Sequence, residues 1–225
     1  MSNGRTHPKE LNSAPGIISK EIPFLREKTK YGVIKCQSRS RQRELIESFV
    51  PKYPNSVICE IGLFGGINIF ALYDKFKKYN MEIVGIDPHE KIEIFNGVHF
   101  SEIDKELTHT RYNFYKGLRL NIEDIIQRHK LDVQYINDTS WNAHSLLKDN
   151  SIGILHVDGD HSYKGVKKDL NLFWSKMKKN SVILMDDFEW KGVKEATLEF
   201  QIQHKDTLKL EETFEGKKGI LYVSK

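Results

Sequence analysis

The sequence predicts an α/β fold with a doubly wound, mostly parallel sheet of seven strands. Short apolar runs alternate with helix-like stretches along most of the chain, which is typical of a parallel sheet with right-handed crossovers. The chain then ends in two strand-like segments, residues 207–214 and 219–225, with four residues between them. This ending breaks the alternation and predicts a terminal antiparallel hairpin.

The individual elements follow from length and periodicity. Five runs have the apolar character of buried strands: residues 56–62, 82–87, 133–137, 152–158 and 181–187. Helical periodicity predicts helices over residues 39–50, 67–79, 118–130, 162–177 and 192–204. The long stretch 88–117 is rich in aromatic residues, which indicates either a functional loop or a helical insertion.

The length of 225 residues fits one large domain with an N-terminal appendage better than two domains. We expect residues 1–50 to form a tail and a helical lid or extension, and residues 51–225 to form the main domain. Residues 1–18 are polar and indicate a flexible tail, whereas the mixed pattern over 18–34 favours no particular element.

Composition narrows the class of protein. No run approaches the ~18 consecutive apolar residues of a membrane span, and the polar start lacks the apolar core of a secretory signal. Cys36 and Cys59 form no metal-type pair, so we expect a reduced, cytoplasmic compartment. The net charge of +4 comes from lysines scattered among acidic residues. We therefore expect neither a membrane nor a nucleic acid as the partner.

A glycine-rich segment, EIGLFGGIN, follows the first apolar run over residues 60–68. Its spacing differs from the GxGxxG of dinucleotide folds, and the carboxylate of Glu60 would repel a phosphate. Glu60 suits a cationic ligand group instead. Asp87 closes the second run about twenty residues later, where a carboxylate can accept hydrogen bonds from both ribose hydroxyls.

This segment resembles the ExGxxxGxS loop of class I S-adenosylmethionine (SAM)-dependent methyltransferases, with Asn68 where that family usually has Ser or Thr. The order of the elements, with its terminal hairpin, is also that of the Rossmann-like class I methyltransferase fold. The resemblance implies SAM as the cofactor, with adenine contacts at the end of the third strand. The implied cofactor-binding residues are Glu60, Gly62, Phe64, Gly66, Asn68, Asp87, Asp138 and Thr139. A structural turn at the glycines and a helix-capping Asp87 are the alternatives.

Acidic residues end the fourth and fifth runs, at Asp158 and at the Asp186–Asp187 pair. Neighbouring strand ends should bring the three carboxylates to one point, where they would repel one another unless a cation joins them. Hard oxygen ligands favour Mg²⁺, Mn²⁺ or Ca²⁺. A solvated turn at Asp158 and a helix cap at Asp186–Asp187 are the alternatives.

The segment HVDGDHSY, residues 156–163, resembles the IDGDHSY motif of metal-dependent bacterial O-methyltransferases, which are relatives of macrolide-sugar and catechol O-methyltransferases. The resemblance covers about residues 56–190. It implies methyl transfer to a hydroxyl of a small acceptor, with a sugar or glycosyl group favoured, and Mg²⁺ or another divalent cation as a second cofactor. The implied residues are Asp158, Asp186 and Asp187 as metal ligands, and Asp158 and His161 as catalytic residues, with His161 as the general base.

Other interpretations stay open. A structural histidine is the alternative at His161, His156 is interpreted as a packing residue, and the role of Asp160 is undecided. A metal-independent methyltransferase with a nitrogen or nucleic-acid acceptor is the second hypothesis, and a catalytically inactive binding subunit is the third. The sequence also leaves open a homo-oligomer, and it does not decide whether Trp190 stacks on an acceptor or packs in the core.

Overall fold

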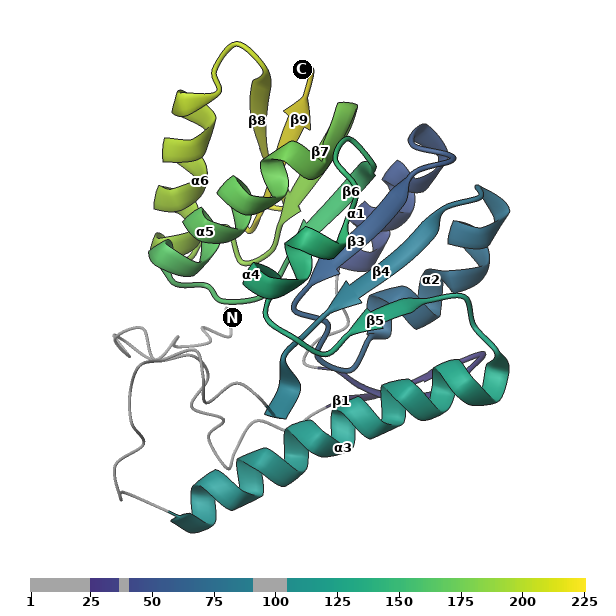
Figure 1. The fold of residues 1–225 in the computed structure, drawn as a ribbon. Coiled ribbons are helices and arrows are strands. Elements are labelled where there is room, and N and C mark those ends of the chain that lie inside the picture. The colour runs from purple at the N-terminus through teal and green to yellow at the C-terminus, as the bar shows by residue number, and fades with distance from the viewer. Residues whose placement is uncertain (1–24, 37–40, 91–104) are drawn as a thin grey trace, which may run out of the picture.

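The computed structural model describes residues 25–36, 41–90 and 105–225. Its main sheet has seven strands in the order β5-β4-β3-β6-β7-β9-β8 (Figure 1). The strands from β5 to β7 pair in parallel, whereas β9 pairs antiparallel with both β7 and β8. The predicted fold class, a doubly wound and mostly parallel sheet with a terminal antiparallel hairpin, is confirmed.

Each predicted apolar run forms a strand. The parallel strands are β3 (Val57–Ile61), β4 (Glu82–Ile86), β5 (Gln134–Ile136), β6 (Ile152–Val157) and β7 (Met177–Met185). The hairpin consists of β8 (Leu208–Thr213) and β9 (Lys218–Val223). The central strands β3 and β6 are buried along their whole length, which explains why the sequence shows continuous apolar runs there.

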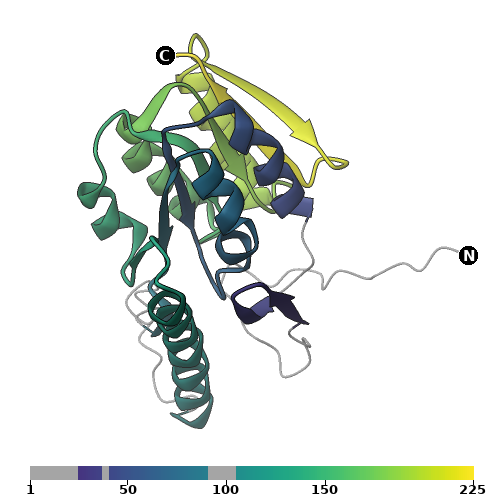
Figure 2. The same cartoon turned by 90° about the vertical axis from the view of Figure 1, so that its right-hand side faces the viewer.

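Helices cover both faces of the sheet, as Figure 2 shows. One face carries α1 (Arg41–Phe49) and α2 (Ile67–Lys78), and the other carries α4 (Ser140–Ala143), α5 (Tyr163–Phe173) and α6 (Lys191–Gln203). Short 3-10 turns follow three of these helices, at Val50–Lys52, His144–Leu146 and Trp174–Lys176. Alternate strand residues enter the two core layers, because successive side chains of a strand point to opposite faces.

Two helix boundaries differ from the prediction. The helix predicted from residue 118 is α3 (Lys105–His129), which starts earlier and takes in part of the long aromatic stretch. Gly117 lies inside this helix, and a helix tolerates one interior glycine at a cost of about 1 kcal/mol. The helix predicted to reach residue 177 ends at Phe173, because Met177 already pairs with Ile152 as the first residue of β7. Phe95 and Phe100 lie outside the described residues.

The N-terminal region contributes to the core. Residues 25–36 form an antiparallel hairpin of β1 (Leu25–Thr29) and β2 (Gly32–Cys36). The mixed sequence pattern over residues 18–34 had favoured no particular element there. Ile34 of this hairpin and Ile46 and Phe49 of α1 are buried in the same core cluster as Phe70 of α2. Residues 1–18, the predicted tail, lie outside the described residues. The division at residue 50 stays a prediction.

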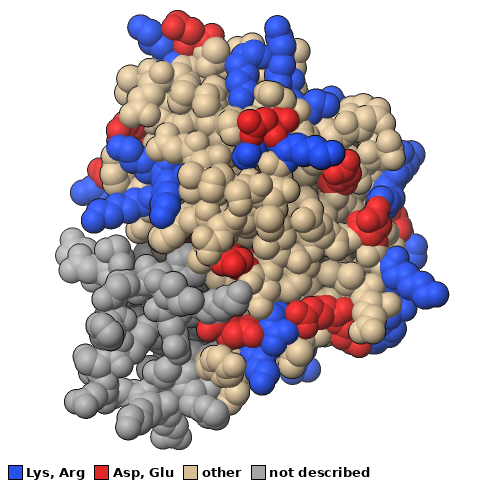
Figure 3. Space-filling model, in the orientation of Figure 1, with Lys and Arg blue, Asp and Glu red and all other residues tan. Residues whose placement is uncertain are grey.

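The surface has a mixed charge. Basic and acidic side chains are interspersed around the face that Figure 3 shows. Such mixing is typical of a solvated surface and does not favour a nucleic-acid groove on this face. Within the described ranges, no helix is both long enough and apolar enough to cross a membrane.

Candidate active site

The predicted site residues lie where the parallel strands end, and backbone hydrogen bonds hold these ends in register. The amide of Gly62 donates to the carbonyl of Ile86 at 2.9 Å, and the amide of Asp158 donates to Ile61 at 2.8 Å. The amide of Asp186 likewise donates to Val157 at 3.0 Å. The cofactor loop and the acidic segments therefore share one edge of the sheet, which is where open α/β sheets bind ligands.

The glycine-rich loop requires glycine at two positions. Gly62 has φ of 87°, and a Cβ there would lie 2.0 Å from the carbonyl oxygen of Asp158. Gly66 has φ of 77° and precedes the first residue of α2. Both are in the left-handed region that favours glycine, so these residues let the chain turn sharply from β3 into α2.

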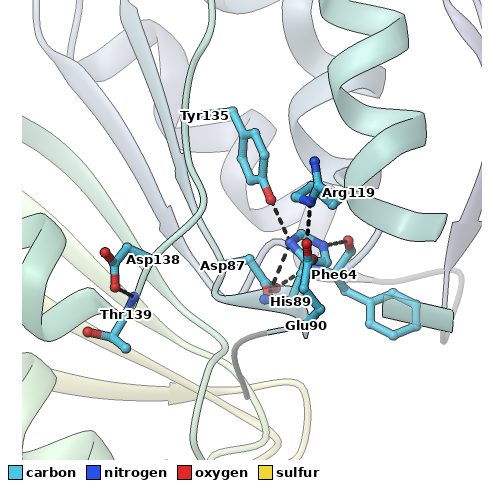
Figure 4. Close-up of polar contacts among 8 residues, drawn as sticks. All are labelled: Phe64, Asp87, His89, Glu90, Arg119, Tyr135, Asp138 and Thr139. Atoms are coloured by element: carbon cyan, nitrogen blue, oxygen red, sulfur yellow. Dashed lines mark hydrogen bonds and ion pairs between the residues drawn. The ribbon is translucent and has the colours of Figure 1, made fainter. Parts of the chain in front are cut away.

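Phe64, between the two glycines, is held from both sides of its backbone (Figure 4). It has φ of 49°, which is uncommon for a residue with a side chain. Its amide donates to Asp87 Oδ2 at 2.7 Å, and its carbonyl lies 2.7 Å from His89 Nε2. The other nitrogen of His89 lies 2.7 Å from the hydroxyl of Tyr135. This network fixes the loop in one conformation.

The predicted ribose residue, Asp87, belongs to this network, and the predicted adenine residues lie beside it. Asp87 Oδ1 accepts the amide of His89 at 2.8 Å, so each carboxylate oxygen of Asp87 has one backbone partner and a further lone pair for a ribose hydroxyl. Asp138 and Thr139 follow the neighbouring strand β5, to one side of Asp87 in Figure 4. The Thr139 hydroxyl caps α4 by accepting the amide of Asn142. Asp87, Asp138 and Thr139 thus lie at adjacent strand ends.

Glu60 and Asn68 lie beneath the loop and are buried, with relative exposures of 3% and 6%. Glu60 Oε1 accepts from Asn68 Nδ2 at 2.7 Å and lies 3.0 Å from His156 Nδ1. Glu60 Oε2 and Asn68 Oδ1 are buried acceptors without a hydrogen-bond partner among the described residues. Buried polar atoms are rarely left unpaired, so these acceptors fit a cationic donor such as the ammonium group of SAM.

His161 lies between two of the predicted carboxylates. Its Nε2 is 3.4 Å from Asp158 Oδ1 and 3.5 Å from Asp187 Oδ2. Burial lowers the pKa of His161, but its contact with Asp158 and the charges of Asp158, Asp187 and Asp160 outweigh it, so the pKa is raised overall. Burial raises the pKa of Asp187 to about 6, against the opposing charge of His161. The arrangement orients an imidazole that can gain and lose a proton.

Two neighbours of His161 have separate roles. Asp160, whose role the sequence left open, accepts the backbone amide and the hydroxyl of Ser162 at 2.9 and 3.0 Å, and therefore shapes the turn into α5. Trp190 is 52% exposed, and its ring centroid lies 5.0 Å from that of His161. An exposed indole beside the imidazole offers a surface for a ring of the acceptor.

Two of the three predicted metal ligands, Asp158 and Asp186, lie in one cluster of possible ligand atoms. Within the described ranges, one cluster places three ligand atoms within 4.8 Å of one another, and it consists of His156, Asp158 and Asp186. Lys218 of β9 forms an ion pair with Asp186, so a metal at this position requires Lys218 to move. Burial lowers the pKa of Lys218 to about 8. The donor set of two carboxylates and one imidazole suits a divalent cation.

Sequence reasoning missed His89, Tyr135 and Lys218, and it interpreted His156, which is fully buried, as a packing residue. The first two join segments that are 46 residues apart, so no local spacing indicates their contact. Lys218 opens the last strand, and only the pairing of β9 with β7 brings it to Asp186. His156 had a usable signal: it is a polar residue inside an apolar run, two positions before Asp158.

Comparisons with known proteins agree with this fold. The O-methyltransferase NovP superposes with a TM-score of 0.60 at 14% identity, over 81% of this chain and 78% of NovP. The precorrin-6y C5,15-methyltransferase from Geobacter metallireducens has a TM-score of 0.55 at 12% identity, over 84% and 90%. The O-methyltransferase TomG from Streptomyces achromogenes, solved with SAM, has a TM-score of 0.53 at 10% identity, over 84% and 82%. No curated protein matches the chain in sequence.

The fold and the loop geometry together define a class I SAM-dependent methyltransferase. A family model described as a methyltransferase domain matches residues 59–188, which is more than half of the chain. The chain belongs to this methyltransferase family.

Proposed function

We propose that this protein transfers a methyl group from SAM to a hydroxyl of a small acceptor, with a sugar or other glycosyl group as the favoured class. The observation that carries the proposal is the position of His161 between Asp158 and Asp187, at the sheet edge that also holds the glycine-rich loop. A hydroxyl acceptor requires a nearby base, because a neutral hydroxyl is a poor nucleophile near pH 7.

The side chains of the site divide the work. With Nε2 of His161 directed at the two carboxylates, its Nδ1 accepts the proton of the acceptor hydroxyl. Asp158 and Asp187 stabilise the imidazolium that forms. Asp87 and the loop around Phe64 fix the cofactor, so that the acceptor oxygen meets the methyl carbon in line.

We also propose that a divalent cation, Mg²⁺ or another of its class, assists the reaction. Asp158 and Asp186 would hold it, because these two carboxylates belong both to the predicted ligand set and to the cluster in the structure. A divalent cation bound there would favour ionisation of the acceptor hydroxyl.

The exposed indole of Trp190 supports an acceptor that contains a ring. It lies beside His161, so a sugar or aromatic ring stacked on the indole would place a hydroxyl near the base. NovP and TomG are both O-methyltransferases by name, which agrees with an oxygen acceptor.

The proposed compartment is the cytoplasm. Cys59 is a free thiol buried within β3, and burial raises the pKa of this thiol. An unpaired, unreactive cysteine suits a reducing compartment.

Methyl transfer from SAM labelled in its methyl group tests the proposal. We expect label on hydroxylated acceptors in a panel of nucleotide sugars, free sugars and catechols, and none on amines or RNA. Asp158→Asn should abolish this transfer while binding of SAM is retained. Label found only on amines or RNA would overturn the hydroxyl acceptor.

Metal-independent transfer is the second candidate, and the ion pair of Lys218 with Asp186 favours it, because that ammonium already neutralises one predicted ligand. Treatment with EDTA separates the two candidates. The metal-assisted reaction should stop and return with added Mg²⁺ or Mn²⁺, whereas full activity in EDTA would leave the metal-independent reaction standing.

A further inference from the structure

His156 has the environment of a metal ligand rather than of a packing residue. Its side chain is fully buried on β6, two residues before Asp158 and paired in register with Glu60 of β3. Its Nδ1 lies 3.0 Å from Glu60 Oε1. An ionised Glu60 can only accept, so the proton of this contact belongs to Nδ1.

In the neutral tautomer that donates from Nδ1, Nε2 of His156 carries the lone pair, and Nε2 has no hydrogen-bond partner among the described residues. A buried nitrogen without a partner is destabilising, because the loss of its hydration is not compensated. One ring nitrogen of His156 and one oxygen each of Asp158 and Asp186 lie within 4.8 Å of one another. A metal-binding histidine usually donates its other ring N–H to a carboxylate, which orients the ring. Glu60 is such a carboxylate for His156.

We propose that the divalent cation of the proposed function is bound by His156 Nε2 together with Asp158 and Asp186, and that the site prefers Mn²⁺ or Co²⁺ to Mg²⁺. The presence of a cation rests on the proposed function. The new inference names the third ligand of that cation and the class of metal that the site prefers. Imidazole nitrogen binds transition metals well, whereas Mg²⁺ prefers oxygen ligands. Asp187 instead faces His161.

Glu60 connects this site with the cofactor loop. The same oxygen that lies near His156 also accepts from Asn68 at the start of α2. The acidic residue of the glycine-rich motif thus orients the metal-binding histidine, and Glu60→Gln should weaken Mn²⁺ binding by about 10-fold to 100-fold.

The test uses the full-length protein, stripped with EDTA and titrated with Mn²⁺, with free Mn²⁺ measured by electron paramagnetic resonance. We expect His156→Leu to weaken Mn²⁺ binding at least about tenfold, and the matched variant Asp187→Asn to stay within about threefold of wild type. Lys218→Met should tighten binding, because it removes the ammonium that pairs with Asp186. Mg²⁺ should displace Mn²⁺ only at a large excess.

A spectroscopic measurement covers the case in which His156→Leu does not fold. In protein labelled with ¹⁵N at histidine, pulsed electron paramagnetic resonance should show nitrogen coupling to Mn²⁺, and the coupling should persist in His161→Gln. Bound Mn²⁺ without nitrogen coupling, or binding lost in Asp187→Asn, would overturn the His156 site and leave the metal-assisted reaction intact. No Mn²⁺ binding at millimolar concentration would overturn the cation in both proposals, while the labelled-SAM assay still tests methyl transfer.

Discussion

At the scale of single residues, the site depends on side chains that are oriented by others. His161 is held by Asp158 and Asp187, and Phe64 is held by Asp87 and His89. Catalytic and cofactor-binding groups need such support, because small displacements of a reacting group cost much of the rate.

Replacing the base tests the role of His161. His161→Gln should lower kcat by roughly 10²–10⁴, because His161 is the imidazole that lies beside both Asp158 and Asp187, whereas the Kd for SAM should change little. Steady-state kinetics and calorimetry measure the two quantities. His204→Gln, at the end of α6, is the control. A wild-type kcat in His161→Gln would remove the assignment.

The contacts of Asp87 and His89 with the backbone of Phe64 predict how a substitution changes the affinity for SAM. Tyr135→Phe removes the hydroxyl that contacts His89 and should weaken SAM binding by about 3-fold to 10-fold, which corresponds to about 1 kcal/mol for one hydrogen bond. Tyr79→Phe, which leaves the loop untouched, should bind SAM normally. An unchanged Kd in Tyr135→Phe would show that His89 does not need this partner.

At the scale of elements, α5 anchors the segment that follows β5. Asp169 of α5 is buried and accepts the hydroxyl of Ser140, the first residue of α4, at 2.5 Å. Thr139, a predicted adenine residue, precedes it. Burial raises the pKa of Asp169 to about 7 from its ordinary 3.8, against the hydrogen bond with Ser140, which lowers it.

This shift predicts how stability depends on pH. Between about pH 4 and pH 7 the folded protein keeps a proton on Asp169 that the unfolded chain has lost, so the free energy of unfolding falls as pH rises through this window, by at most about 1.4 kcal/mol per pH unit. Asp169→Asn has no charge to bury. It should therefore be more stable than wild type at pH 8, with the difference vanishing near pH 4.

Thermal unfolding of the two proteins across this range measures the effect, with the exposed Asp206→Asn as the control. If the stability of wild type and of Asp169→Asn changed with pH in the same way, the pKa of Asp169 would not be raised by burial.

At the scale of the whole molecule, sequence patterns predicted the sheet and the strand ends because both are local features. Each apolar run gives a strand, and a motif at the end of a strand keeps its place when strands pair in parallel. Contacts between distant segments were not predictable in this way. Glu60 and His156 are 96 residues apart, and the ion pair of Lys218 exists only because β9 returns beside β7.

The N-terminal region is a second example, and it carries a prediction. Ile46 of α1 is 1% exposed within the core cluster that includes α2, so α1 belongs to the folded unit. Ile46→Ala should lower the free energy of unfolding by about 2–4 kcal/mol. Denaturant unfolding measures the loss, with the exposed Glu44→Ala as the control. A loss below about 0.5 kcal/mol would mean that α1 does not pack on the sheet in solution.

The central claim is that this protein binds SAM at the edge formed by the glycine-rich loop and Asp87. The most direct test is calorimetric titration of the full-length protein with SAM, once with Mn²⁺ and once with EDTA, in parallel with Asp87→Ala. We expect one site per chain with micromolar affinity in the wild type and strongly weakened binding in Asp87→Ala. No binding of SAM under either condition would contradict it and favour a methyltransferase fold retained as a binding subunit.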